Sequence, residues 1–169
     1  RTTDGALKVI NSESTTNGAF ICPMVLDSNL DILYSDYSSG TNYQIRRYTN
    51  VGLTGTVVKT ILTNALLTNS PSAFAVSKYT TNSTTLLVGT RNGKVLRLIN
   101  ANTTPTWTDI SSSAFVGTIS DIEYGASENE IFVTMSNYNV TSIWYTSNGT
   151  SATPTWVNKE GNFPDIPVR

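Results

Sequence analysis

Short apolar runs alternate with polar turn residues along the whole chain, and their spacing is that of strands rather than helices. The runs are rich in Val, Ile, Thr, Tyr and Phe and are bounded by Gly, Pro, Asn and Ser, a pattern typical of β-strands. No stretch of about 12 residues repeats apolar side chains at helical spacing without such a break. The chain is therefore predicted to be all-β, with three sets of four strands. The predicted strands are 19–26, 31–35, 43–48 and 56–62, then 72–77, 85–90, 94–99 and 106–110, and finally 118–124, 130–135, 142–146 and 155–157.

Turns and strands recur at a spacing of about 50 residues, which indicates an internal repeat. The recurring turn residues are Asp4-Gly5, Asn50, Asn100 and Asn148-Gly149, at spacings of 46, 50 and 48 residues. The tetrapeptide Thr-Pro-Thr-Trp at 104–107 returns at 153–156, 49 residues later. The second strands align as 32–34, 86–88 and 131–133. Within the middle set, Asn92-Gly93 predicts a tight two-residue hairpin.

Four antiparallel strands in each repeat of roughly 45–50 residues are typical of a β-propeller blade. One such sheet has two apolar faces and must stack on neighbours to bury them. Trp107 and Trp156, at the same place in successive repeats, are expected to fill the space between sheets. The predicted fold is a β-propeller arc of four-stranded antiparallel blades, with about three and a half blades present.

The recurring turns resemble the Asp-box, Ser/Thr-x-Asp-x-Gly-x-Thr-Trp, of the sialidase-like, sortilin-like and xyloglucanase-like propellers (BNR repeats). Residues 2–6 resemble its first half, and residues 145–156 resemble it with Asn in place of Asp and an insertion before Thr-Trp. The copies near residues 50 and 100 are more degenerate. In those families the motif stabilises a hairpin far from the active site, so the resemblance implies a structural role. The positions concerned are Asp4, Gly5, Asn50, Asn100, Trp107, Asn148, Gly149 and Trp156.

The repeat divides the chain into blades at 18–70, 71–115 and 116–164. Residues 1–17 are predicted to end a preceding blade, and residues 165–169 to start another. Closed propellers commonly have about 4–8 blades. We therefore expect the chain to be a fragment of one larger propeller domain, or an arc that another chain completes. The expected partners are these remaining blades.

Composition narrows the possible functions. The 169 residues include 11 basic and 12 acidic residues, one Cys and no His. A net charge of −1 removes the electrostatic case for binding nucleic acid, and no apolar run approaches the roughly 18 residues expected of a membrane span. Abundant Thr, Ser and Asn suit a secreted or cell-surface protein. Segments 117–120 and 162–168 are similar to those of large secreted proteins of Bacteroidetes-type bacteria.

A propeller glycosidase would need facing carboxylates, or a cluster of arginines on inner strands. The first strand of each set carries no Arg, so Arg46, Arg47 and Arg91 are interpreted as surface or inter-blade residues. Asp121 and Glu123 alternate on one face of one strand, where a solvated surface is the commoner reason. They are retained as candidate ligand-binding residues, and no catalytic residue is assigned. The chain is therefore predicted to be a binding protein more than an enzyme.

Asp27, Asn29 and Asp31 have the spacing that begins a calcium loop. However, Ile32 follows where Gly is expected, and Ser38 stands where a glutamate closes such a loop. Asp and Asn in turns also accept hydrogen bonds from their own backbone. These residues are kept as weak candidates for calcium, and no cofactor is assigned.

Three tyrosines are the aromatic residues most favoured to face a ligand. Tyr37 and Tyr138 follow the second strands of their sets, in longer loops, and Tyr43 begins a third strand. Loops on a rigid scaffold often bind partners. Cys22 is interpreted as a small buried residue of the first strand.

The function expected from the sequence is that of a non-catalytic binding or scaffolding segment of an extracellular or cell-surface β-propeller protein. Its loops would be presented to carbohydrate or to a surface protein. Two alternatives remain: part of a propeller glycoside hydrolase whose catalytic carboxylates lie outside this chain, and a purely structural subunit of a surface assembly.

Overall fold

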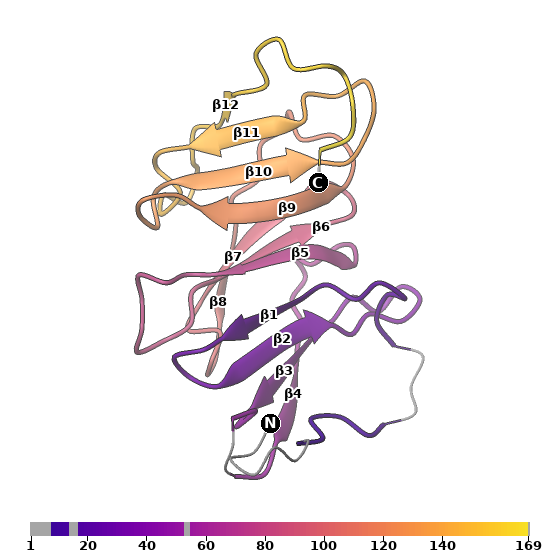
Figure 1. The fold of residues 1–169 in the computed structure, drawn as a ribbon, viewed down its shortest axis with the longest axis vertical. Helices are drawn as coiled ribbons and strands as arrows, with labels where there is room; N and C mark the ends of the chain where they lie inside the picture. The colour runs from indigo at the N-terminus through magenta and orange to yellow at the C-terminus, as the bar shows by residue number, and fades with distance from the viewer. Residues whose placement is uncertain (1–7, 14–16, 53–54, 169) are drawn as a thin grey trace.

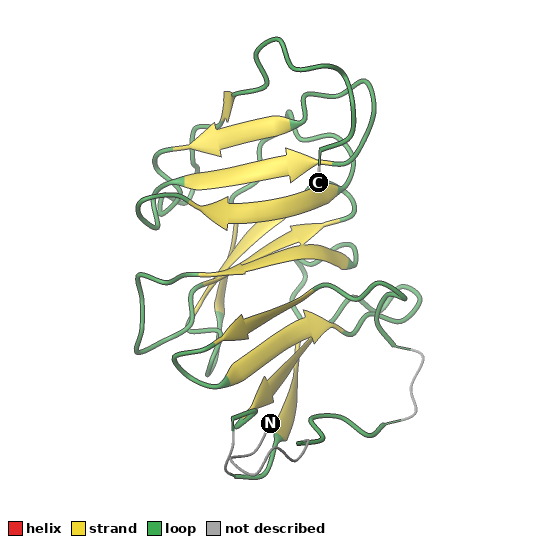
Figure 2. Ribbon diagram, in the orientation of Figure 1, coloured by secondary structure: helices red, strands yellow, loops and turns green. Residues whose placement is uncertain are grey.

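The structure is a computed structural model that describes residues 8–13, 17–52 and 55–168. These residues form three four-stranded antiparallel sheets (Figure 1). Strands and loops make up all of this part of the chain, with no helix in it (Figure 2). The prediction of an all-β chain with three sets of four antiparallel strands is confirmed, and the sheets fit a blade-like fold.

In each sheet the strands lie side by side in chain order. The first sheet contains β1 (Met24–Asp27), β2 (Ile32–Asp36), β3 (Ile45–Thr49) and β4 (Val58–Leu62). The second contains β5 (Pro71–Val76), β6 (Leu86–Thr90), β7 (Val95–Ile99) and β8 (Thr106–Asp109). The third contains β9 (Ile119–Tyr124), β10 (Ile131–Met135), β11 (Ile143–Thr146) and β12 (Val157–Asn158).

The first strand is shorter than the sequence predicts. Residues 19–23 precede β1 instead of belonging to it, and Phe20 and Ile21 are exposed. Pro23 lies immediately before the strand, because proline has no N–H to donate to a strand ladder. Cys22 therefore lies outside the strand and is half-buried, so its interpretation as a buried strand residue was wrong.

The sheets are stacked so that the second lies between the first and the third (Figure 1). One apolar core joins the first and second sheets, and another joins the second and third. The strands β6 and β7 are buried on both faces, which explains their continuous apolar sequences. Strand β10 of the third sheet instead alternates between buried and more exposed residues.

The sheets approach one another most closely at their first strands. Strand β5 contacts both β1 and β9, and β6 also contacts β9. Gly89 of β6 makes this approach possible, because a Cβ there would lie only 2.8 Å from Cβ of Ile119. At this point the Ile119 side chain of the third sheet therefore packs directly against the backbone of the second sheet.

Cross-strand pairing corrects the alignment of the second strands. Tyr34 pairs with Arg47, Leu87 with Arg97, and Phe132 with Tyr145. The partners Arg47, Arg97 and Tyr145 each lie three residues before the recurring asparagine. Tyr34, Leu87 and Phe132 are thus the equivalent residues, and the predicted alignment of 32–34 with 86–88 is wrong by one residue. In strands with consecutive apolar residues, sequence similarity does not distinguish the two faces.

The same side-chain contact ties each pair of neighbouring sheets. Arg47 Nη1 donates to the carbonyl oxygens of Ala101 and Thr103, at 2.8 and 2.6 Å. The equivalent Arg97 Nη1 donates to the carbonyl oxygens of Gly149 and Ser151. Each arginine therefore holds the turn that follows the third strand of the next sheet. For Arg47 this agrees with its interpretation as a surface or inter-blade residue.

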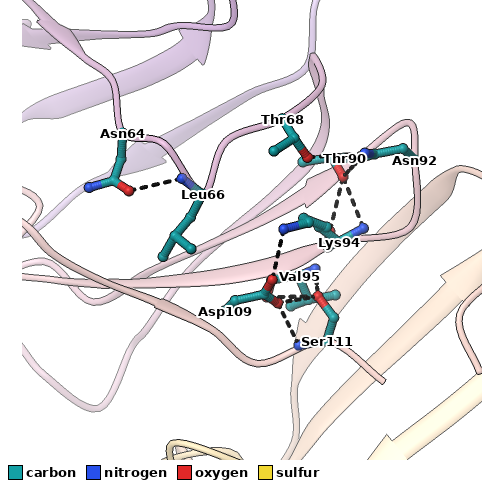
Figure 3. A network of polar contacts seen from close by, with 9 residues as sticks. All are labelled: Asn64, Leu66, Thr68, Thr90, Asn92, Lys94, Val95, Asp109 and Ser111. Carbon is teal, nitrogen blue, oxygen red and sulfur yellow. Dashed lines mark hydrogen bonds and ion pairs between the residues drawn. The ribbon is translucent and has the colours of Figure 1, made fainter. Parts of the chain in front are cut away.

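The hairpin between β6 and β7 has a three-residue loop rather than the predicted two-residue turn. The Thr90 N–H donates to the Lys94 carbonyl oxygen at 3.0 Å, and Gly93 has φ of 81°. This positive φ explains why residue 93 is a glycine, because a three-residue hairpin loop needs one residue in the left-handed conformation. Around it, Thr90 Oγ1 donates to Asn92 Oδ1 at 2.7 Å, and Asn92 Nδ2 donates to Thr68 Oγ1 (Figure 3).

Candidate functional site

A pocket of about 450 Å³ lies at the N-terminal ends of the three first strands. Its wall combines residues from all three sheets. It is formed by 21–23 before β1, Pro71 and Ser72 of β5, 118–120 around the start of β9, and Arg91 and Ser136 after β6 and β10. Because the three sheets converge here, the pocket exists only once they are stacked.

The pocket contains one short polar side chain from the same place in each sheet. Ser72 is an extra residue between the pairs that Pro71 and Ala73 make with β6. Ser120 is the corresponding extra residue of β9, between Ile119 and Asp121. Such bulges redirect side chains at the end of a strand. In the first repeat Cys22 has the equivalent position. It lies directly before Pro23, whose carbonyl oxygen accepts the Asp36 N–H.

Hydrogen bonds orient these side chains. Ser72 Oγ donates to the Ile119 carbonyl oxygen at 2.7 Å, which links the second sheet to the third. Ser120 Oγ donates to the Val168 carbonyl oxygen and lies 2.8 Å from Thr134 Oγ1. The Cys22 thiol donates to the Asp36 carbonyl oxygen at 3.4 Å.

The thiol in the pocket is not an activated nucleophile. Burial raises the pKa of Cys22, and the nearby charge of Asp36 raises it further. A thiol with a raised pKa is protonated at neutral pH, whereas a nucleophilic cysteine needs the thiolate. Cys22 is therefore a wall residue.

Arg91 is the cation of the pocket. Its main chain is held by two contacts, from Arg91 N–H to the Ser70 carbonyl oxygen and from Thr118 Oγ1 to the Arg91 carbonyl oxygen, each 3.1 Å. Its exposed guanidinium has no hydrogen bond or ion pair with any residue that the structure describes. Five N–H donors are therefore available to a ligand. Arg91 is exposed, in line with its interpretation as a surface or inter-blade residue, and the pocket adds the place that it has on that surface.

The pocket wall combines polar groups with apolar surface. The described residues that line it include no Asp or Glu, whereas most glycosidases use a pair of carboxylates. The wall presents hydroxyl and guanidinium groups beside the apolar surfaces of Pro23, Pro71 and Ile119. Donors and acceptors that alternate with apolar surface suit a ligand with many hydroxyl groups.

The three candidate tyrosines do not gather at this pocket. Tyr37 stacks against the Arg46 guanidinium, 3.7 Å from its ring centre, and its hydroxyl donates to Glu13 Oε2 at 3.3 Å. Tyr43 packs against the core between the first and second sheets. Tyr138 is 66% exposed in the loop after β10 and is the one most accessible to a partner.

Asp121 and Glu123 lie on the outer face of the third sheet, outside the pocket. Both are exposed and alternate along β9. Their cross-strand partners on β10 are Thr134 and Phe132. They share one face, as the strand period predicts, but no other carboxylate from a different sheet faces them in the described part of the chain.

Asp27 of the candidate calcium loop is engaged in structural contacts. Its Oδ1 accepts the N–H groups of Asn29 and Leu30, and its Oδ2 accepts Thr84 Oγ1 at 2.6 Å. The carboxylate thus closes its own turn and ties the first sheet to the second. Asp31 has φ of 54°, as a turn residue. The described residues include no cluster of three or more Asp, Glu, Cys or His that could hold a metal ion.

The asparagines that resemble the Asp-box have local structural contacts. Asn50 and Asn100 both follow a third strand and both have φ of 58°. Asn148 Oδ1 accepts Thr155 N–H at 2.9 Å and Thr146 Oγ1 at 2.8 Å. Asp4 and Gly5 lie outside the described residues.

Gly149 and the two tryptophans lie where successive sheets meet. The Gly149 carbonyl oxygen accepts Arg97, as above. Trp107 packs on the core between the first and second sheets, and Trp156 on the next core. Trp156 Nε1 also donates to the Ile110 carbonyl oxygen at 2.8 Å.

The pocket was not predicted from the sequence, although the sequence carries one indication of it. Ser72 and Ser120 lie 48 residues apart, within the range of the repeat. A hydroxyl at the same point of successive repeats, at the start of a first strand, could have marked the convergence of these strands. No sequence pattern indicated a role for Arg91, because most of its neighbours in space come from other repeats.

Comparison with known sequences finds no relative for this chain: no protein-family model matches it, and neither does any curated protein. A separate observation concerns membranes. In the described part of the chain, no helix has the length and apolar character needed to cross one.

Proposed function

We propose that the chain is an arc of an Asp-box-like β-propeller from a secreted or cell-surface protein, and that it acts as a non-catalytic binding and scaffolding segment. Three features support the propeller arrangement. Successive four-stranded sheets are stacked, their first strands lie closest, and the equivalent residues Arg47 and Arg97 make the same contact between sheets. A tandem array in which each sheet contacts only its neighbours is what a repeat architecture requires.

The observation that carries the binding role is the pocket at the N-terminal ends of the first strands. We infer that its ligand is a carbohydrate, because the wall presents serine and threonine hydroxyls, a guanidinium without a partner among the described residues, and proline and isoleucine surfaces. Sugars have polar edges and apolar C–H faces, which match such a lining. The absence of Asp and Glu among the described wall residues favours binding over glycoside hydrolysis.

Binding to a panel of glycans tests this function. The wild-type chain is expected to retain at least one class of glycan and to release no reducing sugar from it. Arg91→Ala removes the ligand-facing cation and is expected to weaken that binding by roughly tenfold or more, as truncation of a charged hydrogen-bond donor does. Lys78→Ala is the matched control, because Lys78 is also an exposed cation but lies at the other end of β5.

A panel on which no glycan is retained would contradict the proposal, and so would equal affinity of wild type and Arg91→Ala. Release of sugar by the wild-type chain would instead favour the glycosidase alternative.

A further inference from the structure

Each sheet has a forward face, the side directed toward the next sheet along the chain. The forward faces of the first and second sheets are covered by the sheets that follow them. The forward face of the third sheet includes Asp121, Glu123, Phe132, Thr134, Tyr145 and Val157. It is uncovered in the described part of the chain, with Phe132 41% and Val157 46% exposed.

The third forward face differs from the second at its first strand. Ala73 and Ala75 of β5 are 5% and 7% exposed in the core shared with the third sheet. The pairing with the second strand makes Asp121 and Glu123 their equivalents on β9. Neither carboxylate has a hydrogen bond or ion pair with a described residue. Two small apolar residues at a sheet contact are thus replaced by two unpaired charges.

The chain nevertheless continues along this face as it does between the earlier sheets. Ser72 of β5 donates to the carbonyl oxygen of Ile119, which starts β9. The equivalent Ser120 of β9 donates to the carbonyl oxygen of Val168. Val168 N–H also donates to the Met135 carbonyl oxygen at 3.1 Å. Residue 168 therefore lies beside β9 where the start of a neighbouring first strand is expected.

A second copy of this chain would be a poor occupant. The face of its first sheet that is directed away from the second sheet would place Met24 and Leu26 opposite the two carboxylates. Pairing with β2 makes these the equivalents of Phe74 and Val76, which pack in the core between the first and second sheets. Arg46 and Lys59 lie on the same face, but they belong to β3 and β4 and are both paired with Glu13. Burying unpaired carboxylates against the apolar side chains of the first strand is strongly unfavourable.

From these observations we propose that the forward face of the third sheet docks a β-sheet whose first strand carries Lys or Arg opposite Asp121 and Glu123. The two carboxylates accept a basic sheet and reject a second copy of this chain. The inference rests on the sheet stacking of the proposed function but not on its pocket. It specifies the chemistry of the neighbouring sheet.

The test places cations on the first strand of the first sheet, β1. Met24 and Leu26 are 60% and 52% exposed, so lysine is tolerated at both. The variant Met24→Lys/Leu26→Lys is expected to associate head to tail at low salt. Wild type and the uncharged control Met24→Ser/Leu26→Ser are expected to sediment as single 18.3 kDa chains.

Two further results identify the face. Association of the lysine variant is expected to be lost at about 1 M salt, where the screening length is about 3 Å. It is also expected to be lost when Asp121→Asn/Glu123→Gln is added. Self-association of the wild type, a lysine variant that stays a single chain, or association that persists without the carboxylates would each overturn the proposal. None of these outcomes alters glycan binding by the wild type, so the two proposals fail separately.

Discussion

At the scale of single residues, Arg97 shows how one buried cation holds two sheets together. It is 8% exposed, and its Nη1 reaches two carbonyl oxygens of the turn after β11. Burial lowers the pKa of Arg97, while Tyr124 and Glu128 act to raise it. An arginine stays protonated even so, because its ordinary pKa is far above neutral. The turn therefore depends on this side chain for the partners of its carbonyls.

We expect Arg97→Met to lower the free energy of unfolding by about 1–3 kcal/mol, because it removes the donor to the buried Gly149 carbonyl oxygen and to the half-buried Ser151 carbonyl oxygen. Arg97→Lys keeps a donor and should lose less. Urea unfolding measures both. The control Lys78→Met removes an exposed cation and should stay within about 0.5 kcal/mol of wild type. Equal stability of Arg97→Met and wild type would show that the contact is not stabilising.

Asp109 carries a pH-dependent contribution to stability (Figure 3). Burial acts to raise its pKa, but hydrogen bonds from Ser111 and Lys94 and the charge of Lys94 outweigh it, so the pKa is lowered from 3.8. The Lys94 Nζ lies 2.9 Å from Asp109 Oδ2. A lowered pKa stabilises the folded state above the ordinary value and loses that stabilisation as the pH falls through the lowered value.

We therefore expect Asp109→Asn to be less stable than wild type at pH 7, and the difference to shrink as the pH falls below 3.8. Thermal unfolding of both proteins across this range measures the difference, and other carboxylates cancel in it. A difference that stays constant with pH would mean that the carboxylate's charge is not involved.

At the scale of elements, the strand β12 owes its place mainly to Trp156, which lies just before it. The indole packs edge-on to Phe115, with ring centres 5.0 Å apart, and donates to the Ile110 carbonyl oxygen. Because β12 has only two residues, its backbone pairing with β11 alone holds it weakly. The tryptophan fastens the edge of the third sheet to the second.

Trp156→Ala is expected to destabilise the protein by about 2–4 kcal/mol, somewhat below the value for a fully buried aromatic residue. Trp156→Phe keeps the packing and loses only the hydrogen bond, so its loss should be about 1 kcal/mol. Urea unfolding followed by far-UV circular dichroism distinguishes them. Phe163→Ala serves as control, since Phe163 is 46% exposed. Similar losses for the Trp156→Ala and Phe163→Ala variants would contradict this account.

The positions of the strands were predicted better than which side of each strand faces the core. All twelve strands exist, because alternation and turn residues are local signals. The alignment of Ile32 with Leu86 was wrong by one residue, since apolar runs such as Leu86–Val88 match in either register. Of the candidate site, Asp121 and Glu123 share a face as predicted, but the pocket around Arg91 did not follow from any local pattern.

At the scale of the whole molecule, stability is concentrated in the middle sheet. Both faces of β6 and β7 are buried, whereas β4 and β12 are edge strands of the two outer sheets and are mostly exposed or half-buried. In a stacked array each sheet is stabilised by its neighbours, so the sheet with two neighbours should unfold last.

Hydrogen exchange is expected to be slowest for the amides of β6 and β7 and fastest among the strands for those of β4 and β12. Mass spectrometry of peptides after exchange measures this order. Comparison of β6 with β10 provides an internal control, because both are central strands of their sheets and differ in the covering of their faces. Equal protection of β6 and β10 would show that the three sheets unfold as one unit.

The amino-acid sequence by itself determined that this protein is all-β and that its described part has three sets of four strands, because these properties depend on residues a few positions apart. Only the tertiary structure decided which face of each strand is buried, that Arg91 is the cation of a pocket, and that Asp121 and Glu123 lie on an uncovered face. Those properties depend on contacts between residues roughly 50 positions apart, which the stacking of sheets creates. A one-residue shift in register changes every such contact while leaving the local pattern almost the same.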